Sequence, residues 1–304
     1  MIKIGCCGFP TSMKKYFENF SVVELNSTFY QYPRTETVEG WRKKAPENFE
    51  FTVKAHQDIS HKANLKVEEA SLQAFERMRQ ICKVLGSKIL LIQTPSSFRP
   101  DMLADAEKFF KEADREGSLL VWETRGSAWE TVDVSKKLGE ALQELDVTHV
   151  TDPFRIMPAY TGEITYFRLH GLGRQMYYYQ YNDEELKKLK EIVSLYEKKC
   201  REVYVLFHNL SMFEDGVRFM EWLSKGTFPK ITGSTGLASI RNVVEKTRYP
   251  VAKSMLIKKL GWRLVELEEG KQVRLNTILA DLPSKTYKNA EELLSDVKAI
   301  CASY

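Results

Sequence analysis

The first 225 residues alternate between short runs of β-branched and aromatic residues and longer segments whose apolar residues recur every three or four positions. The short runs indicate strands and the longer segments indicate amphipathic helices. The eight predicted strands are Lys3–Cys6, Val22–Asn26, Phe49–Lys54, Lys88–Gln93, Leu119–Glu123, Thr148–Thr151, Ile164–His170 and Val203–His208. The main predicted helices between and after them are Val67–Leu85, Met102–Arg115, Val134–Leu145, Asp183–Lys198 and Glu214–Leu223.

Eight strands that alternate with helices over this length predict an α/β fold of the (β/α)8, or TIM barrel, class rather than an open sheet. The segment Asp152–Glu163 is too short and proline-broken for a full helix, so the predicted barrel is imperfect. We expect the barrel over residues 1–228, a linker rich in Gly and Pro over 229–236, and a small, mainly helical, basic domain over 237–304. That domain is expected to contain a hairpin around Glu269-Gly270.

Charge distinguishes the two parts of the chain. Residues 237–304 hold eight Lys and four Arg against eight Asp and Glu, so the whole formal net charge of +4 belongs to this segment. Such a surplus is typical of a solvated surface and can also bind nucleic acid or another anion. No apolar run has the length of a membrane helix, so no membrane partner is expected. Five cysteines and a start without a signal-peptide pattern favour a cytoplasmic location.

Polar and aromatic residues gather where the predicted strands end. In a (β/α)8 barrel these carboxyl ends form the active-site face, so we expect the residues to meet at one rim. They are Glu24, Asn26, Tyr30, Lys54, His61, Gln93, Glu123, Arg125, Trp129, Asp152, Arg168, His170, Tyr181, His208 and Asn209. Burying so many charges costs several kcal/mol per ion unless they are paired, so a functional site is favoured over a purely structural ion-pair network.

The residue types suggest roles. Lys54, Arg125 and Arg168 are predicted to bind an anion, since arginine suits phosphate and carboxylate. The remaining predicted substrate-binding residues are Asn26, Tyr30, Gln93, Trp129, Tyr181 and Asn209. The predicted catalytic residues are Glu24, Glu123, Asp152, His61 and His170. A divalent metal is an open alternative, for which the candidate ligands are Glu24, Glu123, Asp152, His170 and His208. The run Tyr177–Tyr179 either stacks on sugars or bases or packs its own loop.

Several of these residues belong to longer motifs, among them Gly5-x-x-Gly8-Phe9, the string Glu24–Tyr30 and Tyr166-x-Arg168-x-His170-Gly171. With them the chain resembles, from about residue 2 to 225, the YecE-like family, also called domain of unknown function seventy-two. The resemblance implies a TIM barrel with a rim site and no established reaction. Members have been likened to endonuclease-like and sugar-isomerase-like barrels.

The chain departs from that family at Cys6-Cys7, where small hydroxyl residues are usual, and at His208, where the family generally has Asn. The C-terminal segment resembles domain of unknown function twenty-seven ninety-five, mainly through Tyr249-Pro250 and Leu282-Pro283. We therefore expect a barrel enzyme that acts on a phosphate-bearing substrate, with a nuclease or phosphodiesterase on nucleic acid favoured. The alternatives are a non-catalytic protein that binds nucleic acid or a small anion, and a sugar-directed isomerase or lyase.

Overall fold

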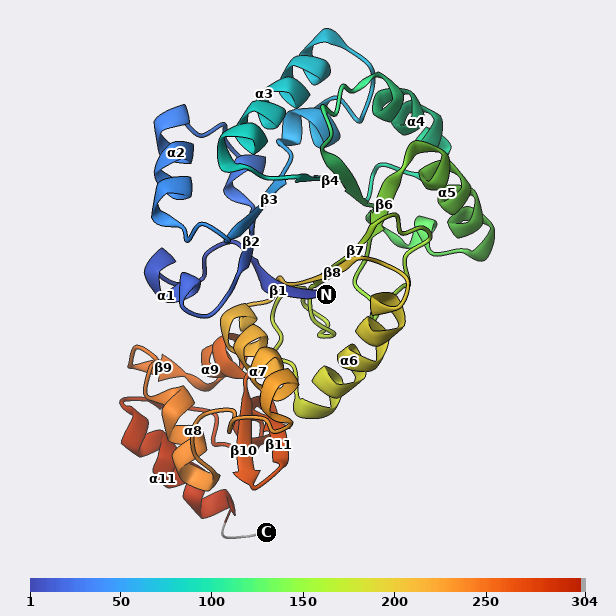
Figure 1. Cartoon of the computed structure of the whole chain (residues 1–304). Coiled ribbons are helices and arrows are strands. Elements are labelled where there is room, and N and C mark those ends of the chain that lie inside the picture. The colour runs from blue at the N-terminus through green and yellow to red at the C-terminus, as the bar shows by residue number, and fades with distance from the viewer. Residues whose placement is uncertain (302–304) are drawn as a thin grey trace. The chain divides into compact units, whose positions relative to one another are not determined.

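In the computed structural model, which describes residues 1–301, the eight predicted strands form one parallel sheet that is nearly closed into a barrel (Figure 1). The strands are β1 (Ile2–Cys7), β2 (Val22–Leu25), β3 (Glu50–Lys54), β4 (Ile89–Gln93), β5 (Leu119–Glu123), β6 (Val147–Val150), β7 (Ile164–Leu169) and β8 (Glu202–Phe207). Their order in the sheet is β6-β5-β4-β3-β2-β1-β8-β7. A single parallel bridge between Thr151 and Phe167 joins the two edge strands. The predicted TIM barrel is thus confirmed, and no strand end differs from its prediction by more than one residue.

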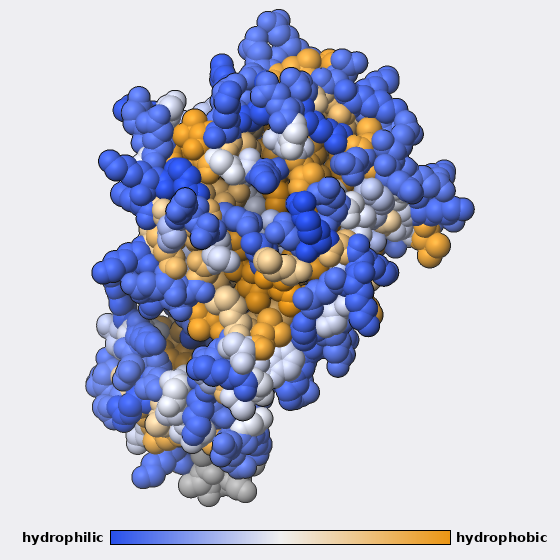
Figure 2. Space-filling view, viewed as in Figure 1, coloured by the Kyte–Doolittle hydropathy of each residue, from blue (hydrophilic) through white to orange (hydrophobic). Residues whose placement is uncertain are grey.

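The helices outside the sheet form where the apolar period places one buried face. In α3, for example, Phe75, Met78 and Cys82 are buried at spacings of three and four, and the helix ends at Gly86, whose φ of 66° suits glycine. The helices of this part are α1 (Met13–Phe17), α2 (Thr35–Lys44), α3 (Glu69–Leu85), α4 (Leu103–Glu112), α5 (Val132–Leu145), α6 (Asp183–Glu197) and α7 (Met212–Lys225). As expected, no helix connects β6 to β7 within the described chain. In Figure 2 polar side chains cover the barrel's helices on the face in view, and apolar ones gather toward its centre.

The barrel interior is filled in layers. At the amino ends of the strands Lys3 Nζ lies 2.5 Å from Glu50 Oε1 and 3.8 Å from Glu202 Oε1. A middle layer of buried apolar side chains includes the stacked rings of Tyr166 and Tyr204, whose centroids are 5.6 Å apart. The polar strand ends lie above this layer, so the core separates the two charged ends of the barrel.

The chain divides into two compact units, Met1–His170 with Lys188–His208, and Gly171–Lys187 with Asn209–Tyr304. The second unit thus takes in the loop between β7 and α6 with the start of α6, and it contains α7 as well as the C-terminal segment. Its further elements are α8 (Gly236–Val244), β9 (Val251–Ala252), α9 (Lys253–Leu260), β10 (Leu264–Glu268), β11 (Lys271–Arg274), α10 (Leu275–Leu279), β12 (Thr286–Tyr287) and α11 (Ala290–Cys301). The predicted hairpin is present as β10 and β11. Sequence periodicity did not predict α8.

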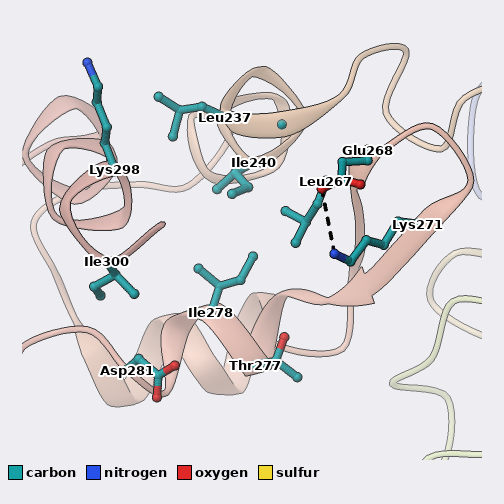
Figure 3. Close-up of a pocket in the computed structure, with 11 residues that line it drawn as sticks. Leu237, Ile240, Leu267, Glu268, Lys271, Thr277, Ile278, Asp281, Lys298 and Ile300 are labelled. Atoms are coloured by element: carbon teal, nitrogen blue, oxygen red, sulfur yellow. Dashed lines mark ion pairs between the residues drawn. The ribbon is translucent and has the colours of Figure 1, made fainter. Parts of the chain in front are cut away.

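A cavity of ≈540 Å³ lies inside the C-terminal part of this unit. Figure 3 shows Ile240 of α8 and Ile278 of α10 facing one another across it, and Leu237 and Ile300 belong to the same lining. Its walls continue the unit's own hydrophobic core, to which Ile240 and Ile278 belong. No helix within residues 1–301 is long and apolar enough to cross a membrane.

Candidate functional site at the carboxyl ends of the barrel strands

The polar strand ends reach one place because strand side chains alternate between the two faces of a sheet. Glu123 and Arg125 are two positions apart along β5 and the residues after it, and so are Arg168 and His170 along β7. In each pair both members therefore point to the same side, into the barrel. We call this group the rim site; it comprises Glu24, Asn26, Lys54, His61, Gln93, Glu123, Arg125, Asp152, Arg168, His170 and His208.

Arg168 lies at the centre of the rim site and is fully buried. Its guanidinium donates to Glu123 Oε2 and, over 2.8 Å, to Glu24 Oε1. Asn26 Oδ1 accepts a longer bond from the same guanidinium at 3.4 Å. The second oxygen of Glu24 accepts from the Tyr166 hydroxyl at 2.9 Å. Two buried carboxylates are thus held by one arginine, which fixes their positions.

Glu123 links this centre to Arg125. Its Oε1 lies 2.6 Å from Arg125 Nε, while Oε2 accepts from Arg168. Burial alone would raise the pKa of Glu123, but the two arginines outweigh burial and hold the pKa well below its usual range. Glu123 is therefore a stable carboxylate that orients Arg125.

His170 is clamped between Arg125 and Asp152. The guanidinium of Arg125 donates to His170 Nε2 over 2.9 Å, so this ring nitrogen is an acceptor and the imidazole is neutral. Nδ1 then carries the proton and faces Asp152 Oδ2 at 3.8 Å. Burial lowers the pKa of His170 even though Asp152 opposes the shift. Asp152 is itself held, since its Oδ2 accepts from the His170 backbone N–H at 2.9 Å.

Lys54 is the third cation of the rim site, and no carboxylate of the described residues pairs with it directly. Its Nζ donates to Gln93 Oε1 over 2.8 Å and lies 4.0 Å from the centroid of the Phe29 ring. Burial, followed by repulsion from Arg168, lowers the pKa of Lys54 to about 8. An amine that titrates near neutral pH can both bind an anion and transfer a proton.

Two further histidines, His61 and His208, lie close enough to these cations for the cations to affect their pKa values. His61 lies in a π-helical turn, Asp58–Lys62, and contacts the Phe29 ring edge-on at 4.8 Å. The ring centroid of His208 lies 5.2 Å from that of His170. Burial lowers the pKa of both residues; Lys54 and Arg125 lower it further at His61, and Arg168 contributes next at His208. Both are neutral at pH 7, and the cations are close enough to affect them.

Four predicted site residues are not part of this cluster. Trp129 is buried, its indole N–H donates to the Phe98 carbonyl over 2.9 Å, and it stacks on Phe98. Tyr30 is 70% exposed. Tyr181 and Asn209 belong to the second unit, where they hold the loop after β7.

The bonds of that loop are specific. The Tyr181 hydroxyl accepts from the Gly171 N–H at 2.9 Å, and Asn209 Nδ2 donates to the Tyr179 carbonyl over 2.8 Å. Asp215 Oδ2 accepts from both the Tyr181 N–H, at 3.1 Å, and Asn209 Nδ2, at 2.6 Å. Gly171 has a φ of 91°, and a Cβ there would lie 2.3 Å from Tyr179 Cβ, so glycine is required.

Sequence reasoning missed two contributors, Tyr166 and Phe29. Tyr166 lies two positions before Arg168 on β7 and therefore points inward as well; strand parity could have found it. Phe29 follows β2 in a short helical turn, Ser27–Phe29, and no sequence signal distinguishes its contact with Lys54 from ordinary packing.

The candidate metal ligands do not converge. Among residues 1–301 no group of three or more His, Cys, Asp or Glu side chains is arranged to hold a metal ion. The physical reason is the position of Arg168, which lies between Glu24 and Glu123 and binds an oxygen of each. The geometry of this donor set fits a guanidinium rather than a divalent cation.

Comparisons with known proteins agree with the fold. The model for "Protein of unknown function DUF72" matches residues 8–227, and the model for "Family of unknown function (DUF5789)" matches 234–302. The second family has a different number from the one that the C-terminal motifs suggested.

Individual relatives and structures are also similar to this chain. UPF0759 protein YunF of Bacillus subtilis is 25% identical over 254 residues, which cover 69% of this chain and 89% of that protein. UPF0759 protein YecE of Escherichia coli is 33% identical over 91 residues, 30% of this chain and 33% of YecE. The crystal structure of a DUF72 family protein from Enterococcus faecalis gives a TM-score of 0.61 at 24% identity and covers 74% of this chain and 98% of its own. At that identity the likeness shows the fold.

Proposed function

The chain belongs to the DUF72 family, and from the rim site of its barrel we propose that it is an enzyme for a phosphate-bearing substrate, with a phosphodiester of nucleic acid as the favoured class. The observation that carries the proposal is the pair of cations Lys54 and Arg125. Arg125 is 18% exposed at its side chain, so it can reach a ligand while Glu123 orients it. A guanidinium after β5 and an ammonium at the end of β3, the two strands on either side of β4, suit a phosphoryl group.

The neutral histidines support an anionic substrate. Lys54 and Arg125 disfavour protonation of both His61 and His208, which means that positive potential prevails where these rings lie. A bound phosphate would offset that potential. Such a site attracts anions and leaves a neutral imidazole able to accept a proton.

These groups can divide the chemistry of phosphodiester hydrolysis. Arg125 and Lys54 would bind the non-bridging oxygens and stabilise charge in the transition state. A neutral histidine, His61 or His208, would take a proton from the attacking water, and the Lys54 ammonium would protonate the leaving oxygen. Arg168, Glu24, Glu123 and Asp152 would position these groups. The active residues are then Lys54, Arg125, His61 and His208.

One observation favours a second candidate, a lyase. A buried lysine whose pKa is about 8 has a substantial neutral fraction at pH 7 to 8, and a neutral amine attacks a carbonyl carbon to form a Schiff base, with the carbonyl oxygen and the two amine protons leaving as water. Lys54 would then be a nucleophile toward an aldehyde or ketone sugar. Treatment with borohydride and such a sugar would leave a covalent adduct on Lys54.

The test is cleavage of labelled single- and double-stranded DNA and RNA by the full chain, with and without added Mg²⁺, Mn²⁺ or Zn²⁺. We expect Lys54→Gln to lower kcat/KM about 100-fold or more, which is the usual contribution of a positioned acid. Lys88→Gln is the matched control, because it removes the same charge from an exposed lysine just before β4, at the opposite end of the barrel. Binding without cleavage would support the non-catalytic alternative, and a borohydride adduct on Lys54 would support the lyase.

A further inference from the structure

The loop after β7 forms a second cavity, one that the proposed reaction does not use. It has a volume of ≈440 Å³ and lies entirely within the second unit, between the loop and the segment from α9 to α10. The cationic and aromatic residues of its lining are Arg174, Tyr178, Tyr179, Lys258, Trp262 and Arg274. We call it the loop cavity.

The loop cavity is basic and contains no acid. None of its lining residues is Asp or Glu. Arg174 and Lys258 are exposed, and no carboxylate of residues 1–301 pairs with either side chain. Arg274 is anchored by backbone carbonyls, since its Nη1 donates to the Gln180 and Trp262 oxygens over 2.8 Å each. Two of the cations are therefore available to a ligand, and the third adds positive potential without being neutralised.

Aromatic rings form the rest of the wall. Tyr178 and Trp262 meet edge to face, with centroids 6.4 Å apart, and both remain partly exposed. The Trp262 ring is fixed because its indole N–H donates to the Lys259 carbonyl over 2.8 Å. Tyr179 is occupied by the Arg274 guanidinium, 4.0 Å from its ring centroid. Tyr178 and Trp262 are thus the rings that a flat ligand can reach.

The cavity of Figure 3, in the same unit, shows that this chemistry is particular to the loop. Its two lysines, Lys271 and Lys298, are balanced by Glu268 and Asp281, and Lys271 lies 3.8 Å from Glu268. Its inner wall is aliphatic and contains no aromatic residue. It offers neither net charge nor a stacking surface.

We propose that the loop cavity binds a nucleotide of a single-stranded nucleic acid, with the base against Tyr178 and Trp262 and the phosphate at Arg174 and Lys258. Single-strand sites combine basic grooves with aromatic rings in this way, because every base presents a π-face and every residue of the strand carries a phosphate. The proposal rests on the proposed function for its ligand class. The loop starts at Gly171, directly after His170 of the rim site, so one peptide bond joins the loop to the barrel.

The experiment measures fluorescence anisotropy of a labelled ten-nucleotide oligothymidylate with the full chain over a range of salt concentrations. The test variants are Tyr178→Leu and the double variant Arg174→Gln/Lys258→Gln. We expect Tyr178→Leu to weaken binding about tenfold, as loss of one base stack does, and the double variant to weaken binding through loss of the phosphate contacts. The double variant should also reduce the slope of log K against log salt by about 0.7, since it removes the contacts to one phosphate and each neutralised phosphate of a single strand contributes about 0.7. The matched control is Lys271→Gln/Lys298→Gln, which removes the same charge at the cavity of Figure 3.

Equal weakening by both double variants, or no change in either test variant, would overturn the proposal. All test residues are partly or fully exposed, so folding is checked by circular dichroism, and Tyr178→Phe should retain binding because it keeps the ring. Failure of the proposed function is a separate result: binding that depends on Arg174 and Lys258 without cleavage would leave the loop cavity assigned and remove the reaction. Cleavage that is insensitive to the loop variants would do the reverse.

Discussion

The rim site and the loop cavity both collect positive charge, but they use it differently. At the rim, Arg168 is completely buried and bonded to Glu24 and Glu123, so its charge holds the site together. In the loop cavity Arg174 is exposed, and no described carboxylate pairs with it. The difference teaches that a cation's partners, rather than its presence, decide whether it supports the fold or meets a ligand. Substitution of Arg168 should therefore lower stability, whereas substitution of Arg174 should weaken binding alone.

The largest effect should come from Arg168→Met. Removing the guanidinium leaves the buried Glu24 without a cation and Glu123 with Arg125 alone, and breaking a buried ion pair in this way costs about 3–5 kcal/mol. We expect the free energy of unfolding, measured with urea, to fall by that amount. Arg174→Met is the matched control and should change it by less than about 0.5 kcal/mol, as exposed substitutions do. Equal stability of the two variants would contradict the contrast between the regions.

The next largest effect concerns acid stability of the barrel. His149 is buried on β6, where its Nδ1 accepts from the Ala159 N–H at 3.0 Å and Nε2 faces Thr124 Oγ1 at 3.1 Å. Burial lowers its pKa to about 4, below the value of about 6.5 in an unfolded chain. The folded state therefore binds fewer protons at this site, so the contribution of His149 to stability is full above pH 6.5 and is lost as the pH falls toward 4.

The full loss from this histidine is about 3 kcal/mol, because one pKa unit corresponds to about 1.4 kcal/mol. Urea unfolding of the wild-type chain and of His149→Gln between pH 7.5 and 4.5 measures it. Glutamine keeps an acceptor and a donor and does not titrate. The variant should therefore lose less stability than the wild type over this range; parallel curves would contradict the assignment.

The barrel could be predicted from sequence because its strands are buried on both faces and separated by helices with a clear apolar period. That pattern depends on local order alone, and it located every strand. Prediction was weaker in the second unit, where α8 follows a Gly- and Pro-containing segment that resembles a linker. The loop after β7 groups with the C-terminal segment through long-range contacts, which periodicity does not encode. One of them is the hydrogen bond from the Leu264 N–H to Gln180 Oε1 at 2.9 Å.

The candidate site could be predicted as a set but not as a network. Carboxyl ends of barrel strands converge, so listing polar residues there collected Glu24, Glu123 and Arg168 correctly as neighbours. The sequence alone does not show that Arg168 lies between the two carboxylates. A divalent-metal site therefore remained an alternative at the level of sequence. Trp129 was predicted to stack on a substrate because it follows β5. Tryptophan has a large apolar area, however, and it is readily buried when a partner accepts its indole N–H, as the Phe98 carbonyl does here.

The last prediction separates the two regions by pH. Lys54, whose pKa is about 8, is charged below that pH and neutral above it, so its attraction for a phosphodiester is present at pH 7 and is lost as the pH rises through 8. Arg174 stays charged throughout, because arginine is not deprotonated in proteins. A dinucleotide keeps one phosphodiester charge over this range. The rim-dependent part of the binding is the factor in the dinucleotide's binding constant that Lys54→Gln removes. Above pH 8 we expect this factor to fall by up to about tenfold per pH unit. The part removed by Arg174→Gln should change much less between pH 7 and 9. Titrations of the dinucleotide at these pH values measure both parts, and a rim-dependent part that is constant to pH 9 would show that Lys54 does not bind the phosphate.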